Sequence, residues 1–354
     1  MALATDYAAE VELIEAALQR ALSVPHPSLQ RFYGMMQYHL GWLDRTLQES
    51  SERNRGKRVR PLLTLLSCRA AGGDSAQSLP AAVGVELVHN FSLVHDDIED
   101  RSDFRRHREA VWKLWGDAHA INVGDALFAM ARIHVNRLLD EGVSPRRVLG
   151  AVSAFDEACL SLTEGQFLDM LFESEQTVAL DDYLWMIRGK TAALIACACQ
   201  VGAMVATDDS DVIRALHDFG YNLGMAFQIE DDLLGIWGDP GVTGKPAGDD
   251  ILNRKKTLPV VFAWSQGAMP DAPAPLREAA GFLLKAYGKS GEMSSGDALR
   301  IAETLDGIGA KESCAVMSKE YTTQAMAALS HPALEDSARR ALRALAISLL
   351  GRAS

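Results

Sequence analysis

Basic segments are scarce in this sequence, and their scarcity excludes one class of function. The 354 residues carry 47 acidic and 35 basic side chains, for a formal net charge of −12, and no block of Lys and Arg is longer than a few residues. A protein that binds the phosphate backbone of a nucleic acid needs a basic surface. We therefore expect no nucleic-acid partner, and any basic residues that matter should act at a local site.

Cysteines and export signals are scarce as well. The five cysteines lie scattered in apolar stretches, and none has the spacing of a zinc site. We expect buried free thiols in a reducing compartment. Met1 to Glu12 carries acids and no basic residue, unlike a secretory signal. The most apolar window, Ala192 to Ala206, is shorter than a membrane span, so we expect a cytoplasmic protein without a transmembrane segment.

Strands with alternating apolar and polar residues are also missing, as are repeats and low-complexity tracts. Apolar residues recur instead at intervals of three and four, which is typical of helices. We expect an all-α bundle of about a dozen helices around a central cavity, in a single domain that spans residues 1–354. The predicted helices cover residues 11–22, 29–47, 62–71, 79–96, 120–139, 146–173, 182–206, 211–237, 258–264, 276–287, 296–308, 311–329 and 334–350.

A first acidic cluster ends one of these apolar runs. On a helix, residues three or four positions apart share a face, so Asp96, Asp97 and Asp100 project together. Like charges at this spacing repel each other, so the cluster is a poor stabilising device and a suitable site for a divalent cation. Most acidic runs are solvated helix ends, and this cluster alone leaves both interpretations open.

A second acidic cluster favours the metal-site interpretation. Gln228 precedes Asp231 and Asp232 by one helical turn, and a loop with Lys245 and the pair Lys255-Lys256 follow. Acids followed by bases therefore occur twice, about 135 residues apart. This pattern indicates divalent cations that hold a phosphate-bearing substrate.

A basic turn precedes the first acidic cluster. Lys57, Arg58 and Arg60 lie just before or beside Pro61, which is well placed to open a helix. Three cations at a helix N-terminus oppose the helix dipole, but together with the free N–H groups they suit an anion. A solvated basic turn is the alternative, and we favour the anion site.

Two isolated polar residues interrupt apolar faces. His89 lies two turns before Asp96 on the same stripe, and the acids and bases nearby favour a ligand contact over a core histidine. Lys190 stands where a long apolar stretch begins, and an unpaired ammonium is costly to bury. We therefore expect an anionic partner for Lys190.

Together these motifs resemble the trans-isoprenyl diphosphate synthases, also called polyprenyl synthetases. The resemblance runs from about residue 56 to about residue 261. It implies an isoprenoid-synthase-type helical bundle and a homodimer. The motifs that carry it are Gly56-Lys-Arg-Val-Arg-Pro61, Leu93-Val-His-Asp-Asp-Ile-Glu-Asp100 with Arg105-Arg106, Glu164-Gly-Gln166, Lys190-Thr191, and Phe227-Gln-x-x-Asp-Asp232 with Gly244-Lys245.

The resemblance also implies a reaction and a role for each motif. The reaction is the head-to-tail condensation of isopentenyl diphosphate with an allylic prenyl diphosphate, and Lys190 and the acids are its catalytic groups. About three Mg²⁺ ions, or Mn²⁺ in their place, would grip the allylic diphosphate. Their ligands would be Asp96, Asp97, Asp100, Asp231 and Asp232. Further contacts to the allylic diphosphate would come from Arg105, Lys190, Thr191, Gln228 and Lys245, and contacts to isopentenyl diphosphate from Lys57, Arg60, His89 and Arg106.

Product length depends in this family on the residues just before the first Asp. Bulky side chains four and five positions ahead of it shorten the product, and here those positions hold Ser92 and Phe91. An aromatic residue at the fifth position with a small one at the fourth resembles the geranylgeranyl-type arrangement. It implies a C20 product, with C15 as the alternative. Core packing is the other explanation for Phe91.

The chain departs from the family pattern in three places. The residues His107 to Ala110 replace the usual Gly-x-Pro-Thr, Gly235 replaces the last acid of the second cluster, and Arg254 replaces a common glycine. The change at Gly235 would weaken the coordination of one metal, although Asp231 and Asp232 could suffice and Asp249 or Asp250 could help.

Two other functions fit part of the pattern. A terpene cyclase on the same fold needs the acids but no second diphosphate site, and the altered loop His107 to Ala110 keeps that function open. A non-catalytic subunit of a heteromeric synthase tolerates the loss of acids, whereas this chain keeps five of six. The basic residues of the predicted isopentenyl diphosphate site favour condensation.

Overall fold

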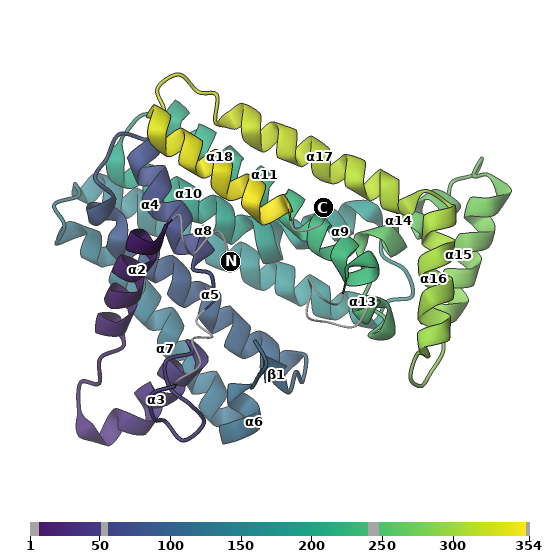
Figure 1. Ribbon diagram of the computed structural model, residues 1–354, viewed down its shortest axis with the longest axis horizontal. Helices are drawn as coiled ribbons and strands as arrows, with labels where there is room; N and C mark the ends of the chain where they lie inside the picture. The colour runs from purple at the N-terminus through teal and green to yellow at the C-terminus, as the bar shows by residue number, and fades with distance from the viewer. Residues whose placement is uncertain (1–6, 51–55, 240–247, 352–354) are drawn as a thin grey trace. The chain divides into compact units, whose positions relative to one another are not determined.

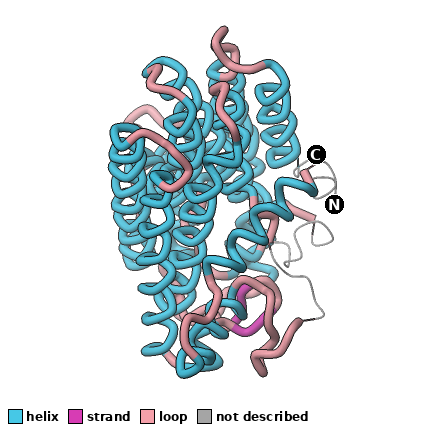
Figure 2. The backbone as a smooth tube through the Cα atoms, turned by 90° about the vertical axis from the view of Figure 1, so that its left-hand side faces the viewer, coloured by secondary structure: helices cyan, strands magenta, loops and turns pink. Residues whose placement is uncertain are grey.

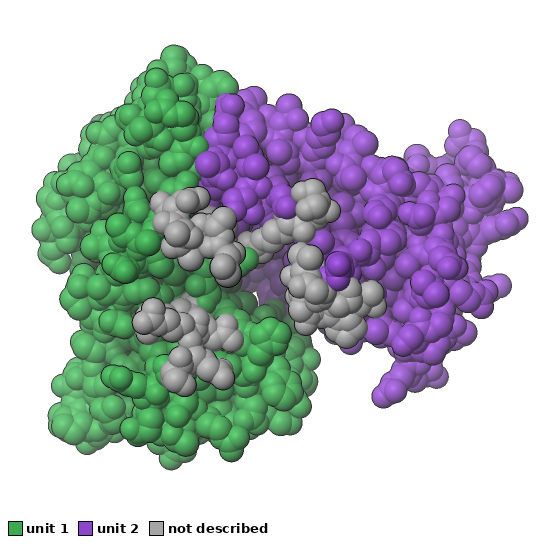
Figure 3. Space-filling view, in the orientation of Figure 1, with its two compact units in different colours: residues 1–159, 197–217, 329–342 green, residues 160–196, 218–328, 343–354 purple. Residues whose placement is uncertain are grey.

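The computed structural model describes residues 7–50, 56–239 and 248–351, and most of these residues are helical (Figure 1). Figure 2 also shows loops and a pair of short strands, β1 (Phe104–Arg105) and β2 (Arg108–Glu109). They form the only sheet within the described ranges. The all-α prediction is confirmed, although the sequence did not indicate the strand pair. The chain divides into two compact units, which Figure 3 colours separately. A single domain over residues 1–354 stays a prediction.

Unit 1 comprises Met1–Cys159, Cys197–His217 and Leu329–Leu342. Four helices contribute residues to both units: α8 (Pro145–Ser174), α10 (Ala193–Ala206), α11 (Ser210–Trp237) and α18 (Asp336–Leu350). The other elements of unit 1, besides β1 and β2, are α2 (Ala8–Ala21), η1 (Pro27–Leu29), α3 (Gln30–His39), α4 (Val59–Ala70), η2 (Ser75–Ser78), α5 (Leu79–Glu99), α6 (Val111–Trp115), α7 (Asp117–Asn136) and η3 (Arg137–Leu139).

The helix pair α5 and α7 carries the first acidic cluster. A Cβ at Gly84 of α5 would lie 2.8 Å from Val135 of α7, and one at Gly124 of α7 would lie 2.1 Å from the His95 ring of α5. The early part of α5 therefore faces the late part of α7, so the two helices are antiparallel. The missing side chains allow this close approach, which holds the end of α5 against α7.

The sequence predicted a helix over residues 29–47, and the C-terminal end of this prediction was wrong. Helix α3 stops at His39, and Gly41 follows with a φ of 87°, a conformation that ends helices and suits glycine. The chain then turns back, with an isolated bridge between Leu43 and Glu49.

Unit 2 comprises Leu160–Ala196, Asp218–Ala328 and Arg343–Ser354. One apolar cluster of unit 2 surrounds Tyr183, Met225 and Ile229, and a second surrounds Trp264 and Ile301. The remaining elements of the unit are α9 (Leu180–Ile187), the π-helical turn η4 (Arg188–Ala192), α13 (Asp249–Leu252), α14 (Leu258–Gly267), α15 (Ala274–Tyr287), α16 (Ser295–Gly307) and α17 (Ala310–Ala328).

The segments α9, η4 and α10 form one continuous helical run, Leu180–Ala206. With 27 residues, this run is long and apolar enough to cross a membrane. The apolar window Ala192 to Ala206, noted in the sequence, covers only its last part. However, 72% of its most apolar window is buried inside the protein. A mostly buried run of this kind is typical of a core helix in a soluble protein.

Candidate active site

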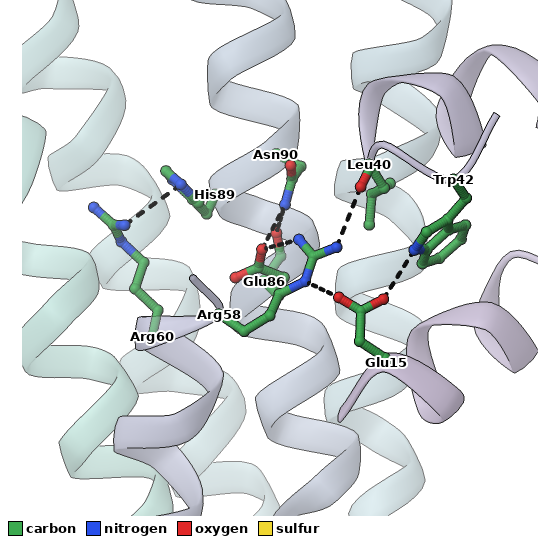
Figure 4. Close-up of polar contacts among 8 residues, drawn as sticks. All are labelled: Glu15, Leu40, Trp42, Arg58, Arg60, Glu86, His89 and Asn90. Carbon is green, nitrogen blue, oxygen red and sulfur yellow. Dashed lines mark hydrogen bonds and ion pairs between the residues drawn. The ribbon is translucent and has the colours of Figure 1, made fainter. Parts of the chain in front are cut away.

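The basic turn before α4 contains three cations in different environments (Figure 4). Arg58 has a left-handed backbone, with φ 50° and ψ 36°, and its guanidinium is buried between Glu15 and Glu86. Lys57 is exposed, and Arg60 is half-buried and turned toward His89. The charge of Arg58 is therefore taken up by ion pairs inside the protein. Lys57 and Arg60 are the cations of this turn that a ligand can reach.

Arg60 and His89 form a pair that is suited to an anion. Arg60 Nη1 lies 3.4 Å from His89 Nε2, and the imidazole accepts because a guanidinium only donates hydrogen bonds. Burial, followed by the charges of Arg60 and Arg106, holds the pKa of His89 well below its ordinary value of 6.5. Arg60 Nε is buried without a hydrogen-bond partner among the described residues. A buried, unpaired donor is costly unless a ligand satisfies it.

A tight hairpin carries Arg105 and Arg106. In the strand pair Arg105 lies opposite Arg108, so Arg106 and His107 form the two-residue turn, and their φ values are 53° and 62°. A turn of this kind normally takes Asn-Gly, so other residues in it are strained. A Cβ at Gly56 would lie 3.1 Å from Arg106 Cζ, so the Arg106 guanidinium lies against the basic turn. The altered loop therefore still brings Arg106 to the predicted anion site.

The first acidic cluster lies at the end of α5 and is paired with Arg105. Arg105 Nη2 lies 2.6 Å from Asp97 Oδ1 and 3.0 Å from Asp96 Oδ2. Burial raises the pKa of Asp97 to about 6, although hydrogen bonding to Arg105 lowers it. Asp97 Oδ2 is buried and has no hydrogen-bond partner among the residues that the structure describes, whereas Asp100 is exposed. A buried carboxylate oxygen without a partner suits a hard divalent cation.

The two acids of the second cluster, in unit 2, have opposite environments. Asp231 is exposed, and Asp232 is buried. Asp232 Oδ2 accepts hydrogen bonds from Leu258 N at 2.7 Å and from the Tyr183 hydroxyl, and its Oδ1 accepts one from Gln228 Nε2 at 3.0 Å. Burial raises the pKa of Asp232 to about 6. Asp232 therefore ties α11 to α9 and α14, while Asp231 faces solvent.

The π-helical turn η4 presents Lys190 and Thr191. The Thr191 hydroxyl donates to Gln228 Oε1 at 2.7 Å and so orients the amide of Gln228. Lys190 Nζ pairs with Asp169 of α8, which is the anionic partner that the sequence led us to expect. A Cβ at Gly165 would lie 2.2 Å from the backbone N of Lys190, so α8 and η4 approach closely. Turns of the π type are frequent at functional sites.

A different acid fills the space beside Gly235. A Cβ at residue 235 would lie 1.9 Å from Asp250 Oδ2, so the Asp250 carboxylate takes the position of a side chain there. Asp250 also interacts with Lys255. Burial alone would lower the pKa of Lys255, but the charges of Asp250 and Asp232 outweigh burial and raise this pKa. Of Asp249 and Asp250, the two acids that the sequence offered as replacements, Asp250 is the one that lies against Gly235. Lys245 lies outside the described residues.

Comparison with known proteins decides the family. The sequence profile of the family described as Polyprenyl synthetase matches residues 41–281. The chain belongs to the polyprenyl synthetase family. The resemblance to the trans-isoprenyl diphosphate synthases is thereby confirmed, and the protein is an enzyme of the prenyltransferase class.

The relatives of this family member cover most of its length. It is 39% identical over 341 residues to the (2E,6E)-farnesyl diphosphate synthase of Mycobacterium bovis, which covers 96% of this chain and 91% of the relative. It is 47% identical over 262 residues to the geranylgeranyl diphosphate synthase of Mycobacterium tuberculosis, with 71% and 73% covered. The crystal structure of a polyprenyl synthetase from Streptomyces coelicolor A3(2) matches with a TM-score of 0.86 and 36% identity, over 96% of this chain and 97% of that one.

The carboxylates of this polyprenyl synthetase fit Mg²⁺ better than a metal that needs a closed cage. Within residues 7–50, 56–239 and 248–351, no three Asp, Glu, His or Cys side chains group around one point. Mg²⁺ usually binds through one or two carboxylates and completes its shell with water and substrate phosphate. The unpaired Oδ2 of Asp97 and the exposed carboxylate of Asp231 fit that mode. The five metal ligands proposed from the sequence stay predictions.

Several partners of the site were not predicted from the sequence. Tyr183 holds Asp232, and Glu15 and Glu86 hold Arg58. Glu86 gave a signal, because an acid between Val85 and Leu87 in an apolar helix needs a cation. Tyr183 and Glu15 lie in ordinary amphipathic helices and gave none.

Two partly buried histidines, His39 and His89, predict an effect of pH on stability. Burial, followed by the charge of Arg106, holds the pKa of His39 well below 6.5, and that of His89 is lowered as well. Unfolded histidines take up protons near their ordinary pKa, so the unfolded state binds more protons and the free energy of unfolding falls as the pH drops below about 6.5. The midpoint temperature of thermal unfolding should therefore fall between about pH 7 and about pH 5. We expect this fall to be smaller in the variant His39→Gln. The exposed His119→Gln is the control, and equal slopes for both variants would contradict the prediction.

Proposed function

We propose that this protein condenses isopentenyl diphosphate with an allylic prenyl diphosphate, head to tail, and releases diphosphate. The observation that carries the proposal is the anion site of unit 1, where Arg60 keeps a buried donor unsatisfied beside His89 and Arg106 lies against Gly56. An enzyme that ionises one prenyl diphosphate and cyclises it needs no such second site. The names of the relatives, farnesyl and geranylgeranyl diphosphate synthase, support elongation of a short prenyl chain.

The chain's own residues divide the binding of the two substrates. We assign the diphosphate of isopentenyl diphosphate to Lys57, Arg60, His89 and Arg106, which fix the position of its double bond. We assign the allylic diphosphate to Arg105 in unit 1, to Lys190, Thr191 and Gln228 in unit 2, and to Lys245 outside the described residues. Negative charge grows on the leaving diphosphate as the allylic C–O bond breaks, and preorganised cations stabilise it. No side chain is assigned as general base, because the released diphosphate can accept the proton.

Mg²⁺ is the proposed metal, about three ions in all, with Mn²⁺ as the alternative. When bound, it supplies Lewis-acid stabilisation of the diphosphate charge. The ligands that we propose are Asp96, Asp97 and Asp100 in unit 1 and Asp231 and Asp232 in unit 2, with Asp250 in place of the acid missing at Gly235. Asp232 would first have to give up hydrogen bonds from Tyr183, Gln228 and Leu258.

A product assay with Mg²⁺ separates the candidate functions. The protein is incubated with isopentenyl diphosphate and, separately, dimethylallyl, geranyl or farnesyl diphosphate, and the products are identified by mass. Linear products longer by five-carbon units establish the proposed function. A hydrocarbon formed from one allylic substrate without isopentenyl diphosphate establishes the cyclase, and inactivity with every starter favours a non-catalytic subunit.

Phe91 is our candidate for the residue that limits chain length, and we propose a C20 product with C15 as the alternative. Its buried ring packs against the rings of His95 and Phe128, with centroids 5.6 and 5.1 Å away. Ser92 is half-buried, and its hydroxyl donates to His89 O at 2.9 Å. The aromatic group thus gives the end of α5 a bulky apolar surface five residues before the acids.

Replacing Phe91 by Ala is therefore expected to lengthen the main product by at least one five-carbon unit, because it removes this bulk. Chromatography of the dephosphorylated products measures the length. Phe155→Ala is the control, because it removes a buried ring from unit 1 away from the acids. It should lower the thermal midpoint without changing the product, and the same product from Phe91→Ala would exclude this role.

We further propose that the protein is a cytoplasmic homodimer. Leu160, Phe167 and Leu171 lie on one face of α8 and are exposed, and Trp185 of α9 is exposed beside Phe167 in a shallow groove. Contiguous exposed apolar side chains mark interaction surfaces. A second copy of the chain is the partner that the family resemblance implies.

Replacing Phe167 by Glu is expected to shift the protein from dimer to monomer, because a charge would have to be buried in the interface. Light scattering after size-exclusion chromatography measures the mass. Leu299→Glu in α16 is the control, since Leu299 and Phe167 have similar exposure, 61% and 64%. A dimer that survives Phe167→Glu would place the interface elsewhere.

A further inference from the structure

The basic turn before α4 is built around a buried group of three charges. Arg58 Nε donates to Glu15 Oε1 of α2, and Arg58 Nη1 donates to Glu86 Oε1 of α5, both at 2.6 Å. Each acid has a second partner: Trp42 Nε1 donates to Glu15 at 2.9 Å, and Asn90 Nδ2 donates to Glu86 at 3.0 Å. The network, shown in Figure 4, thus joins helices α2 and α5 to the turn.

This group is a poor choice if stability is its only role. The side chains of Arg58 and Glu86 are 0% and 3% exposed, and removing charges from water costs about as much as their attraction returns. The left-handed backbone of Arg58 adds a further cost, since residues other than glycine are strained there. Well-packed apolar residues would stabilise the same space at least as well.

The geometry of the turn gives the group a second role. Because the Arg58 side chain points into the protein, the flanking cations are directed elsewhere: Lys57 is exposed, and Arg60 is turned toward His89. Glu86 lies one helical turn before His89 on α5. Burial lowers the pKa of Arg60, and the negative charge of Glu86 opposes this shift.

We infer that Glu15, Arg58 and Glu86 position the isopentenyl diphosphate site. Arg58 does not touch the ligand; it fixes the strained turn so that Lys57 and Arg60 present their charges together. Glu15 makes the N-terminal helix α2 part of this support, although α2 carries no residue assigned to substrate. The inference rests on the proposed function, and it identifies Arg58 as a positioning residue.

An exposed ion pair between α2 and α4, the helix that follows the basic turn, provides a matched control. Arg69 of α4 lies 3.2 Å from Glu10 of α2, and their side chains are 39% and 26% exposed. This pair also joins α2 to α4, but it lies near the opposite end of α4 from the basic turn. If charges between α2 and α4 act only through stability, both pairs should affect ligand binding in the same way.

Binding of isopentenyl diphosphate in EDTA tests the inference, because the proposed contacts are three cations and a histidine and include no proposed metal ligand. Titration calorimetry of Arg58→Lys and Glu15→Gln is expected to show affinity reduced about tenfold or more, since a displaced charge contact is worth at least that factor. Arg69→Lys is expected to bind like the natural protein. In steady-state assays with Mg²⁺, the KM for isopentenyl diphosphate should rise while the KM for the allylic substrate stays constant.

The outcomes separate two questions: whether the isopentenyl diphosphate site exists, and whether Glu15, Arg58 and Glu86 position it. If the natural protein does not bind isopentenyl diphosphate without metal, the proposed site itself fails. If it binds, and either variant binds equally well with an unchanged thermal midpoint, the positioning role of the group is overturned. Glu15→Gln keeps the size and the hydrogen-bonding capacity of the side chain, so it provides a folded variant if Arg58→Lys does not fold. An equal rise of both KM values would indicate a general structural role and would also overturn the inference.

Discussion

Replacing Asp97 by Asn is expected to lower kcat by about a thousandfold, which is the effect of removing a group that stabilises developing charge. Asp97 Oδ2 is buried without a partner among the described residues, and Oδ1 is held by Arg105. An amide keeps the shape of the side chain but removes the negative charge that a divalent cation requires. The metal-free binding of isopentenyl diphosphate should not change, because Asp97 is not among its proposed contacts.

Asp103→Asn is the control for this variant. Asp103 follows the same helix end and pairs with Lys113 at 3.0 Å, but both side chains are exposed. Surface ion pairs contribute little, so this substitution should leave kcat and the thermal midpoint almost unchanged. The metal role of Asp97 fails if its variant retains activity at saturating Mg²⁺, or if both variants lose activity equally.

Replacing Gly235 by Asp is expected to impair the enzyme, although it restores the acid that the family usually has there. The new Cβ would lie 1.9 Å from Asp250 Oδ2, so two carboxylates would compete for one space. We expect a loss of about 1–3 kcal/mol in stability from overpacking and a fall of about a hundredfold in kcat from the displaced carboxylate.

The double variant Gly235→Asp with Asp250→Gly tests whether the two positions exchange one function. It should recover a large part of the activity, because a single carboxylate again occupies the shared space. Gly281→Asp in α15 is the control, since a Cβ there meets nothing within 4 Å. Full activity of the single Gly235→Asp variant, or no recovery in the double variant, would contradict the replacement by Asp250.

Features encoded over a few residues could be predicted from the sequence. Helical periodicity indicated the long helices, and the spacing of Asp96, Asp97 and Asp100 placed the first cluster at a helix end, where the structure has it. The need of Lys190 for an acid also followed from local burial, and Asp169 meets that need. Each of these inferences uses contacts within one helix or the cost of burying one charge.

Features that depend on distant partners could not be predicted. Arg58 looked like its basic neighbours, and only Glu15 and Glu86, 43 and 28 residues away, make it a buried residue. For Gly235 the sequence offered Asp249 and Asp250 but could not decide between them, and only the fold brings Asp250 into the space beside Gly235. The hairpin was missed because its turn residues, Arg106 and His107, lack the Asn-Gly signal of such a turn.

We propose that a second diphosphate site makes this enzyme a condensing synthase. The decisive experiment measures the release of diphosphate from an allylic substrate in Mg²⁺, with and without isopentenyl diphosphate. We expect release to depend on isopentenyl diphosphate, with one diphosphate released for each five-carbon unit added to a linear product. Release that proceeds at the same rate without isopentenyl diphosphate, with a cyclic hydrocarbon as product, would contradict the claim.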